Sequence, residues 1–296
     1  MVRNDRTMRK KYLQRIVTMI VWYQAVGKVS KYCFQMGEKE MYQKEDIIRD
    51  LRKLGITAGD MVLMHSSFKA LGEIEGGAKT FFDAFMELLG EDGTLIIPTL
   101  SFSTVTAQTP LFDIENTPSC VGYLTEYFRT CYEGTIRSMH PTHSCCAKGK
   151  YAEDIIRDHE KDITPVGSNS PFAKLPQYGG KILMLGCSTR CNTSMHGVEE
   201  TAEPIYCINR KEPVRYLLKK GDSVTEQIGY RHSFCVDDTK YIQHYDRIFD
   251  LLAEDAYTVG KVLEATCYLM SAKAVWEKGH EKLKNDPLFF VDVQCD

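Results

Sequence analysis

DMVLMH (Asp60–His65) and GTLIIPT (Gly93–Thr99) are the two apolar runs that decide the fold. Each is short enough for a single buried strand and is bounded by polar or turn-forming residues. The segment between them begins at Gly76-Gly77 and places phenylalanines and leucines at helical spacing as far as Leu89. A strand, a helix and a second strand in this order predict a parallel strand pair and an α/β fold.

Further elements are expected on both sides of this unit. The pattern predicts helices over 44–54, 122–131, 151–159 and from about Thr193, and strands over 145–147 and 180–187. The last third is expected to be rich in helices, with 262–270 apolar enough for a strand or a buried helix. Because no internal repeat or linker is found, residues 41–296 are predicted to form one domain that follows a basic N-terminal extension, residues 1–40.

The composition is that of a globular protein, with 43% hydrophobic and 26% charged residues among 296. No run of about 18 apolar residues is present, so a membrane span is not expected. Residues 1–40 carry nine Lys/Arg and three Asp/Glu, a charge of +6, and the total of −3 therefore requires −9 on residues 41–296. An acidic body would repel nucleic acid and suits a cationic substrate.

The eleven cysteines show no C-x-x-C spacing and no accompanying histidine pattern. Reduced thiols in a cytoplasmic protein are therefore expected, with no zinc or other metal. One alternative remains open here, a cysteine hydrolase that pairs Cys187 or Cys146 with His143 or His196. The spacing sets no distance between these groups.

The usual nucleotide-binding and hydrolase motifs are absent: the chain has no G-x-G-x-x-G, P-loop, G-x-S-x-G or H-E-x-x-H. Three segments rich in Ser, His and Arg lie near predicted strand ends, where α/β proteins place ligand sites. They are HSSFKALG (His65–Gly72), RSMHPTHS (Arg137–Ser144) and CNTSMHGVEE (Cys191–Glu200). Taken singly, the first segment also fits a capped turn, the second a solvated loop, and the third a surface pair of side chains.

The third segment carries a pair suited to acid–base chemistry. His196 and Glu199 are three residues apart, which places them on one face of the predicted helix. A carboxylate in that position could orient the imidazole and stabilise its charged form, as a general base requires. In the second segment, Arg137 could bind a phosphate with its planar guanidinium, with Ser138 beside it.

Seven segments in register resemble the aminoglycoside 3-N-acetyltransferase family: HSSFKALG, EGGAKTFFDAF, GTLIIPT, RSMHP, NSPFAKL, GGKILMLG and NTSMHGVEE. The resemblance runs from Tyr42 to near Phe290 and leaves residues 1–40 outside. It implies a three-layer α/β/α sandwich with a mixed central sheet. It also implies direct transfer of an acetyl group from acetyl-CoA to an amine, the 3-amino group of an aminoglycoside.

The resemblance further implies roles for particular residues. His196 is the expected general base and Glu199 its neighbouring acid. The expected coenzyme A site consists of His65, Ser66, Ser67, Phe68, Lys69, Arg137 and Ser138. The implied partners are a small-molecule amine and coenzyme A, and a homodimer is one expected assembly.

The segment Gly229–Phe234 departs from the family pattern. Family members carry acidic side chains there that meet the cationic aminoglycoside, whereas this chain has Arg231 and no carboxylate. Glu226, Asp237 and Asp238 flank the segment and are the expected substitutes. Two further alternatives therefore stay open: an N-acyltransferase for another amino sugar or small amine in metabolite or polysaccharide synthesis, and an acyl-CoA-binding protein without catalysis.

Overall fold

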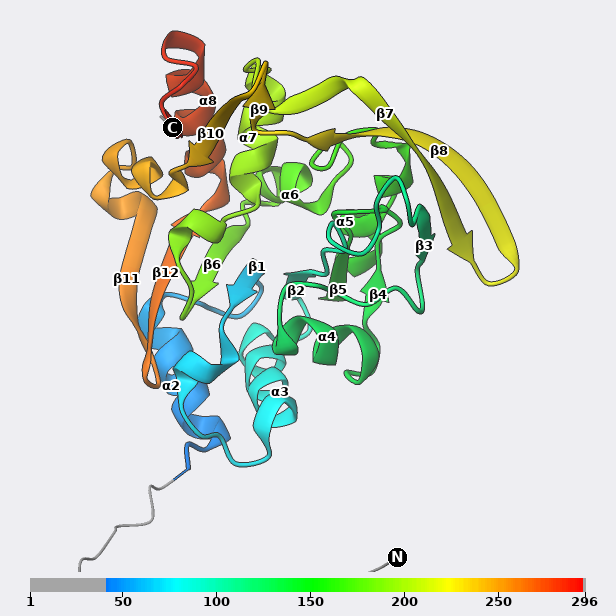
Figure 1. Cartoon of the computed structure of the whole chain (residues 1–296). Helices are drawn as coiled ribbons and strands as arrows, with labels where there is room; N and C mark the ends of the chain where they lie inside the picture. Colours follow the sequence, from blue (N-terminus) through cyan, green and yellow to red (C-terminus); the bar gives the residue numbers. More distant parts are fainter. Residues whose placement is uncertain (1–40, 295–296) are drawn as a thin grey trace, which may run out of the picture. The chain divides into compact units, whose positions relative to one another are not determined.

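The computed structural model describes residues 41–294, and the expected extension, residues 1–40, lies outside them. The described part is built on a seven-stranded sheet with the strand order β11-β12-β6-β1-β2-β5-β4 (Figure 1). β1 pairs in parallel with β2 and with β6, as the β-α-β pattern predicts, and the other neighbours are antiparallel, so the sheet is mixed. Its strands are β1 (Met61–Ser66), β2 (Thr94–Pro98), β4 (Ile136–Arg137), β5 (Cys145–Gly149), β6 (Lys181–Leu185), β11 (Tyr257–Val262) and β12 (Ala265–Ser271).

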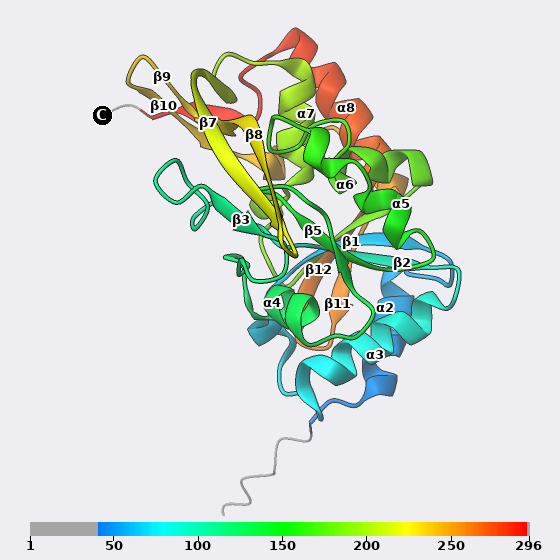
Figure 2. The same cartoon turned by 90° about the vertical axis from the view of Figure 1, so that its right-hand side faces the viewer.

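Helices cover both faces of this sheet (Figure 2). One layer contains α2 (Lys44–Leu54), α3 (Gly77–Leu89) and α4 (Tyr123–Thr130). The other contains α5 (Ala152–Ile156), α6 (Pro171–Lys174), α7 (Ser194–Ala202) and α8 (Ala272–Asn285). The predicted three-layer α/β/α sandwich is therefore confirmed.

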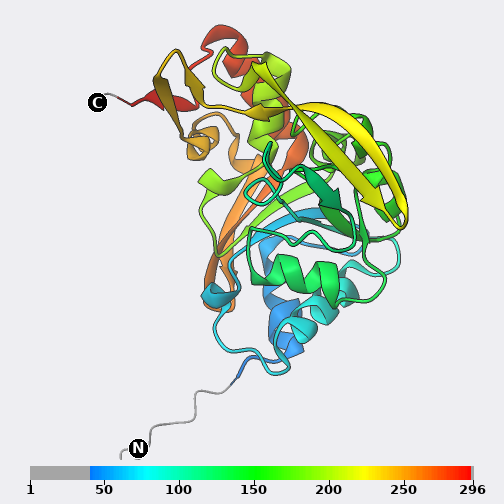
Figure 3. The ribbon, with the colours of Figure 1, turned by 45° about the vertical axis from the view of Figure 1, so that its right-hand side comes forward.

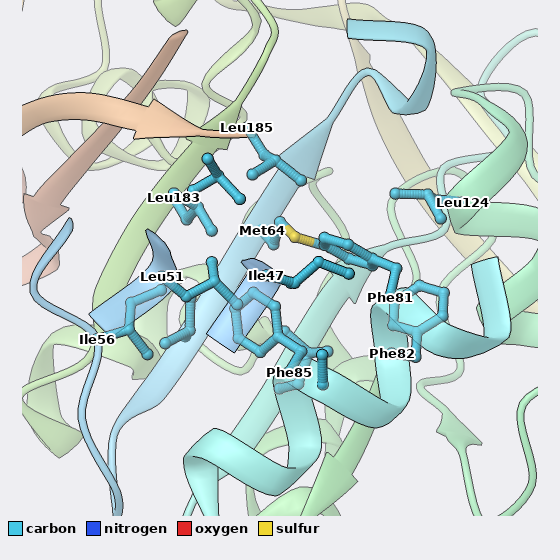
Figure 4. Close-up of a cluster of buried hydrophobic side chains, with 14 of the residues drawn as sticks. Ile47, Leu51, Ile56, Met64, Phe81, Phe82, Phe85, Leu124, Leu183 and Leu185 are labelled. Carbon is cyan, nitrogen blue, oxygen red and sulfur yellow. The ribbon is translucent and has the colours of Figure 1, made fainter. Parts of the chain in front are cut away.

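Successive residues of β1 pack into the two different layers. Val62 and Met64 belong to the cluster under α2 and α3, whereas Met61 and Leu63 belong to the cluster under the other layer. A strand that is covered on both faces must be apolar at every position, which explains why DMVLMH has no polar alternation. In Figure 4, Met64 lies among side chains of both helices and of β6: Ile47, Leu51, Phe81, Phe85, Leu183 and Leu185. Burial of each such side chain contributes about 1.5–3 kcal/mol.

The prediction that the last third of the chain is rich in helices is wrong. Residues 208–293 contain one α-helix, α8, and otherwise strands joined by loops and short 3₁₀ turns: β7 (Ile208–Lys220), β8 (Ser223–His232), β9 (Cys235–Val236), β10 (Thr239–Gln243), β11, β12 and β13 (Val291–Val293). The segment 262–270 contains the last residue of β11, a turn and most of β12, so the strand and not the helix is confirmed there. In β7, Val214, Tyr216 and Leu218 are buried, a period of two that indicates a strand. The predicted helix over 151–159 is also too long, because Asp158 adopts a left-handed conformation (φ 66°) after α5 has ended.

Strands β7 and β8 form a long antiparallel hairpin, yellow in Figure 3. β7 begins shortly after α7, and near its other end it pairs in parallel with the short strand β3 (Leu111–Asp113). Gly221, at φ 56°, lies in the turn of the hairpin. The hairpin is also tied to the main body by a hydrogen bond from Tyr230 N to Ile163 O, 2.7 Å. This arrangement brings the end of β8, with Arg231 and His232, to the side of α7. Among residues 41–294 no helix is long and apolar enough to cross a membrane.

Candidate active site

A cavity of about 330 Å³ opens beyond the carboxyl ends of the parallel strands. Its walls come from the loop after β2, the segment before β5, the turn after β6, helix α7, the end of β8 and a 3₁₀ turn that begins at Tyr245. This is the edge at which α/β proteins place their ligands. The lining residues are Leu100, Phe102, Thr142, His143, Pro165, Arg190, His196, Arg231, His232, Phe234, Gln243 and Tyr245.

His196 is connected to Glu199 through Tyr245. The Tyr245 hydroxyl donates to Glu199 Oε2 at 2.6 Å and lies 2.8 Å from His196 Nδ1. The direct distance from His196 Nδ1 to Glu199 Oε2 is 3.7 Å, too long for a hydrogen bond. Since the single hydroxyl proton goes to the carboxylate, the Tyr245 oxygen accepts from a protonated Nδ1. The lone pair of the neutral imidazole is therefore on Nε2, which has no hydrogen-bond partner among the described residues.

Glu199 is fully buried and has a second tyrosine partner. Tyr206 donates to Glu199 Oε1 at 3.0 Å, so both carboxylate oxygens accept a hydrogen bond. Burial, and then the negative charge of Glu199, hold the pKa of Tyr245 well above its usual value, which keeps the hydroxyl protonated. The two tyrosines thus stabilise a carboxylate that water does not reach.

Local sequence explains how α7 presents His196. Asn192 Oδ1 accepts from Ser194 N at 3.1 Å and stabilises the first turn of the helix. Gly197, next to His196, allows α7 to approach α8 closely: a Cβ there would lie 2.3 Å from Trp276 Cη2 and 2.6 Å from Val166 Cγ1. The i, i+3 spacing predicted for His196 and Glu199 therefore exists, but the two side chains meet through a third.

A second histidine–carboxylate pair lies beside the first. His232 Nε2 is 2.7 Å from Glu200 Oε1, and the rings of His196 and His232 are 4.4 Å apart at 31°. Burial lowers the pKa of His232 well below its ordinary value and raises that of Glu200 to about 7. Burial also lowers the pKa of His143, which meets the ring of His232 edge-on. At neutral pH the histidines that surround His196 are therefore uncharged.

The predicted coenzyme loop lies at the end of β1. His65 and Ser66 pair with Met184 and Leu185 of β6, and Ser67 N donates to Leu185 O. Burial, and to a smaller extent the nearby His196, lower the pKa of His65 to about 3. Phe68 and Lys69 begin a 3₁₀ turn, in which Lys69 is exposed. None of these five residues lines the cavity of His196.

Arg137 and Ser138 are engaged by the protein itself, and neither lines the cavity of His196. The Arg137 guanidinium, 9% exposed, donates to the carbonyl oxygens of Thr99, Thr117 and Ile114 and to Ser144 Oγ. Ser138 is buried, contacts His159 Nδ1 at 2.8 Å and accepts from Cys145 N. The structure therefore does not bring these two residues together with His196 or with the loop at the end of β1.

The three acidic residues that flank the segment Gly229–Phe234 do not line the cavity either. Glu226 pairs with Arg215 on the hairpin at 2.5 Å, and Asp237 pairs with Lys211 at 3.6 Å. Asp238 is exposed, with φ 66°. The only charged residues in the lining are Arg190 and Arg231, and the lining contains none of the expected substitutes Glu226, Asp237 and Asp238.

The cysteine hydrolase alternative finds no support in this geometry. Burial raises the pKa of Cys187 to about 12 and that of Cys146 to about 11, so neither is a thiolate at neutral pH. The cavity lining contains no cysteine. Among residues 41–294 no group of three or more His, Cys, Asp or Glu side chains is arranged to hold a metal ion.

A mixed sheet between two helical layers, with a histidine linked through a tyrosine to a buried carboxylate at the ends of its parallel strands, defines an α/β/α enzyme. The model of the aminoglycoside 3-N-acetyltransferase family matches residues 63–284. The chain therefore belongs to that family, a family of acyltransferases.

Individual relatives agree with this assignment. The chain is 28% identical over 248 residues to the SPbeta prophage-derived aminoglycoside N(3')-acetyltransferase-like protein YokD of Bacillus subtilis (strain 168), covering 77% of this chain and 87% of the relative. It is 31% identical over 259 residues to aminoglycoside N(3)-acetyltransferase III of Salmonella sp, covering 79% and 89%. The crystal structure of a mutant of AAC(3)-IVa in complex with a gentamicin superposes with a TM-score of 0.70 at 25% identity, covering 85% of this chain and 92% of that one. The binary complex of AAC-IIIb with CoASH shares the fold, with a TM-score of 0.71 at 24% identity over 83% and 97% of the two chains.

Proposed function

We propose that this chain transfers an acetyl group from acetyl-CoA directly to an amine, with His196 as the general base. Its relatives are named as aminoglycoside N(3)-acetyltransferases, and a structure of the same fold was solved with CoASH, which supports an aminoglycoside as acceptor and acetyl-CoA as donor. The observation that carries the proposal is the array of Glu199, Tyr245 and His196. It places the proton on Nδ1 and leaves Nε2 of a cavity-lining imidazole without a protein partner among the described residues.

The array suits each step of a direct transfer. The amine attacks the thioester carbonyl carbon in its neutral form, because a protonated amine has no lone pair, and Nε2 takes the proton that the nitrogen loses as the C–N bond forms. The charge that forms on His196 is stabilised through Tyr245 by Glu199. The C–S bond then breaks, and the proton passes from Nε2 to the departing thiolate of coenzyme A. This sequence needs neither a covalent enzyme intermediate nor a thiolate of the protein.

The test is release of free thiol from acetyl-CoA by the purified chain with kanamycin as acceptor. His196→Gln should lower kcat by about 10²–10⁴-fold, the usual contribution of a positioned base. His280→Gln, on α8 and outside the cavity, is the matched control and should keep full activity. A His196→Gln enzyme with turnover near wild type would refute the base assignment. Coenzyme A binding that persists without turnover on any amine would favour a non-catalytic binding protein.

A second candidate acceptor is another amino sugar or small amine. The observation that favours it is the charge of the cavity, whose lining includes two arginines and no carboxylate. An aminoglycoside carries several ammonium groups, and such a wall does not attract it. Parallel assays with kanamycin and with simple amino sugars compare the two candidates directly.

A further inference from the structure

We infer that the cavity beside His196 contains a subsite for an anionic group on the acceptor amine, formed by Arg231 with Arg190 nearby. This inference rests on the proposed acetyl transfer and narrows its acceptor to amines that also carry a phosphate, sulfate or carboxylate. The observations that carry it are the position of Arg231, the lack of a countercharge and the way in which its side chain is held.

Arg231 is held rigidly in the cavity wall. Its Nη1 donates to Val105 O at 2.8 Å and its Nη2 donates to Phe102 O at 2.7 Å. Both acceptors are neutral carbonyls of one loop, so they fix the guanidinium without neutralising it. A guanidinium has five N–H donors, so beyond these two bonds and an interaction with the buried Tyr216 hydroxyl, further N–H groups of Arg231 remain for a ligand. A pre-positioned arginine loses little side-chain freedom when it binds an anion.

The charge of Arg231 has no partner within the described part of the protein. Among residues 41–294 no ion pair joins it to a carboxylate, and none of the residues that line the cavity is Asp or Glu. The two carboxylates of α7 next to the cavity are already engaged, Glu199 by its two tyrosines and Glu200 by His232. A buried or half-buried cation without a countercharge is costly, and a bound anion removes that cost.

Arg190 adds a second positive charge from a different element, the 3₁₀ turn after β6. Its Nη2 donates to Gln243 O at 2.8 Å, while its Nε is 3.9 Å from Asp246 Oδ1. Both members of that ion pair are about half exposed, and a pair of this kind compensates charge only weakly. Two guanidinium groups, from this turn and from β8, thus face one cavity, beside aromatic walls at Phe102 and Phe234 that suit a sugar ring.

The test uses two matched pairs of amines, glucosamine with glucosamine 6-phosphate, and ethanolamine with O-phosphoethanolamine. Thiol release from acetyl-CoA should show a kcat/KM at least about tenfold higher for the phosphorylated member of a pair, as one charge-assisted contact provides. Arg231→Gln should bring that ratio close to one, and Arg231→Lys should keep most of it. Arg215→Gln removes an exposed hairpin arginine outside the cavity and is the matched control, with an unchanged ratio.

The outcomes separate this inference from the proposed function. Preference for the unphosphorylated amine in both pairs, or for kanamycin over all four, overturns the subsite while leaving acetyl transfer intact. If Arg231→Gln instead raises KM for acetyl-CoA and leaves the ratio of kcat/KM between phosphorylated and unphosphorylated amines unchanged, the arginine binds the phosphates of the cosubstrate and the inference is wrong. If no amine is acetylated, the proposed function fails. Calorimetric binding of glucosamine 6-phosphate, compared between wild type and Arg231→Gln, then still decides whether the subsite exists. Thermal unfolding of each variant checks that it is folded.

Discussion

Removal of one oxygen atom, by Tyr245→Phe, tests the link between His196 and Glu199. The hydroxyl of Tyr245 makes the 2.6 Å hydrogen bond to Glu199 Oε2 and the 2.8 Å contact with His196 Nδ1. Phenylalanine keeps the ring and its packing, so the change is confined to these two contacts. The remaining distance between Nδ1 and Oε2, 3.7 Å, is too long to replace them.

The size of the effect follows from what each contact supplies. A hydrogen bond to a charged group contributes about 1.5–3 kcal/mol, and a stabilisation of the charged imidazole by that amount corresponds to about 10- to 150-fold in kcat. Loss of the donor also leaves a fully buried carboxylate oxygen without a partner, which should lower the free energy of unfolding by about 1–3 kcal/mol. KM for acetyl-CoA should change much less than kcat, because the hydroxyl acts through His196.

Tyr206→Phe is the matched control for this experiment. Tyr206 donates to the other oxygen of the same carboxylate, at 3.0 Å, but has no contact with His196. Both variants should therefore lose similar stability in chemical denaturation, whereas only Tyr245→Phe should lose most of its kcat in steady-state thiol-release assays. Equal losses of kcat in the two variants, or a Tyr245→Phe enzyme with more than half of the wild-type kcat, would refute the relay.

Three further predictions concern stability. Burial lowers the pKa of His140 to about 3 and those of His143 and His159 well below the ordinary value, so below pH 6.5 the unfolded chain binds more protons than the native one. Each of these histidines should therefore lower the free energy of unfolding by up to about 1.4 kcal/mol per pH unit as the pH falls below 6.5, and should have no effect above pH 7; urea midpoints that do not fall between pH 7 and pH 5.5 would contradict this. Arg137→Lys should lower the free energy of unfolding by about 2–3 kcal/mol, since lysine cannot bind all of the buried acceptors, yet keep the KM for acetyl-CoA, and a raised KM would support Arg137 as part of the coenzyme site. Gly197→Ala should lose about 1–3 kcal/mol because its Cβ would overlap Trp276, and an unchanged melting temperature would show that α7 and α8 can separate without cost.

Sequence patterns were sufficient for the central elements of the fold. The runs around Met64 and Ile96 are apolar at every position because helices cover both faces of the sheet, and this property is visible in a few adjacent residues. The hairpin of β7 and β8 was missed even though it carried a local signal, the alternation of Val214, Tyr216 and Leu218 before the turn at Gly221. A period of two in the buried residues is the signal that distinguishes such a strand from a helix.

Some residues of the candidate site could likewise be predicted from the sequence, and others could not. His196 and Glu199 could be named from the sequence because their relation is local, three residues on one helix, and the family resemblance singled out the same pair. Tyr245 could not, since it lies 49 residues from His196 in the chain and a lone tyrosine carries no spacing signal. The contacts of Arg137 could not be predicted either, because an arginine that binds a phosphate and one that donates to buried carbonyl oxygens look alike in a sequence.

The sequence by itself determined the sandwich, the family and the histidine–carboxylate pair, since each of these is expressed in residues that are close along the chain. Only the tertiary structure decided that Tyr245 connects that pair, that the Arg137 guanidinium donates to buried carbonyl oxygens and that Arg190 and Arg231 give the cavity its positive charge. These properties depend on contacts between segments tens of residues apart. Such contacts arise when the sheet, its helices and the β7–β8 hairpin close around one cavity, and no local pattern of residue types records them.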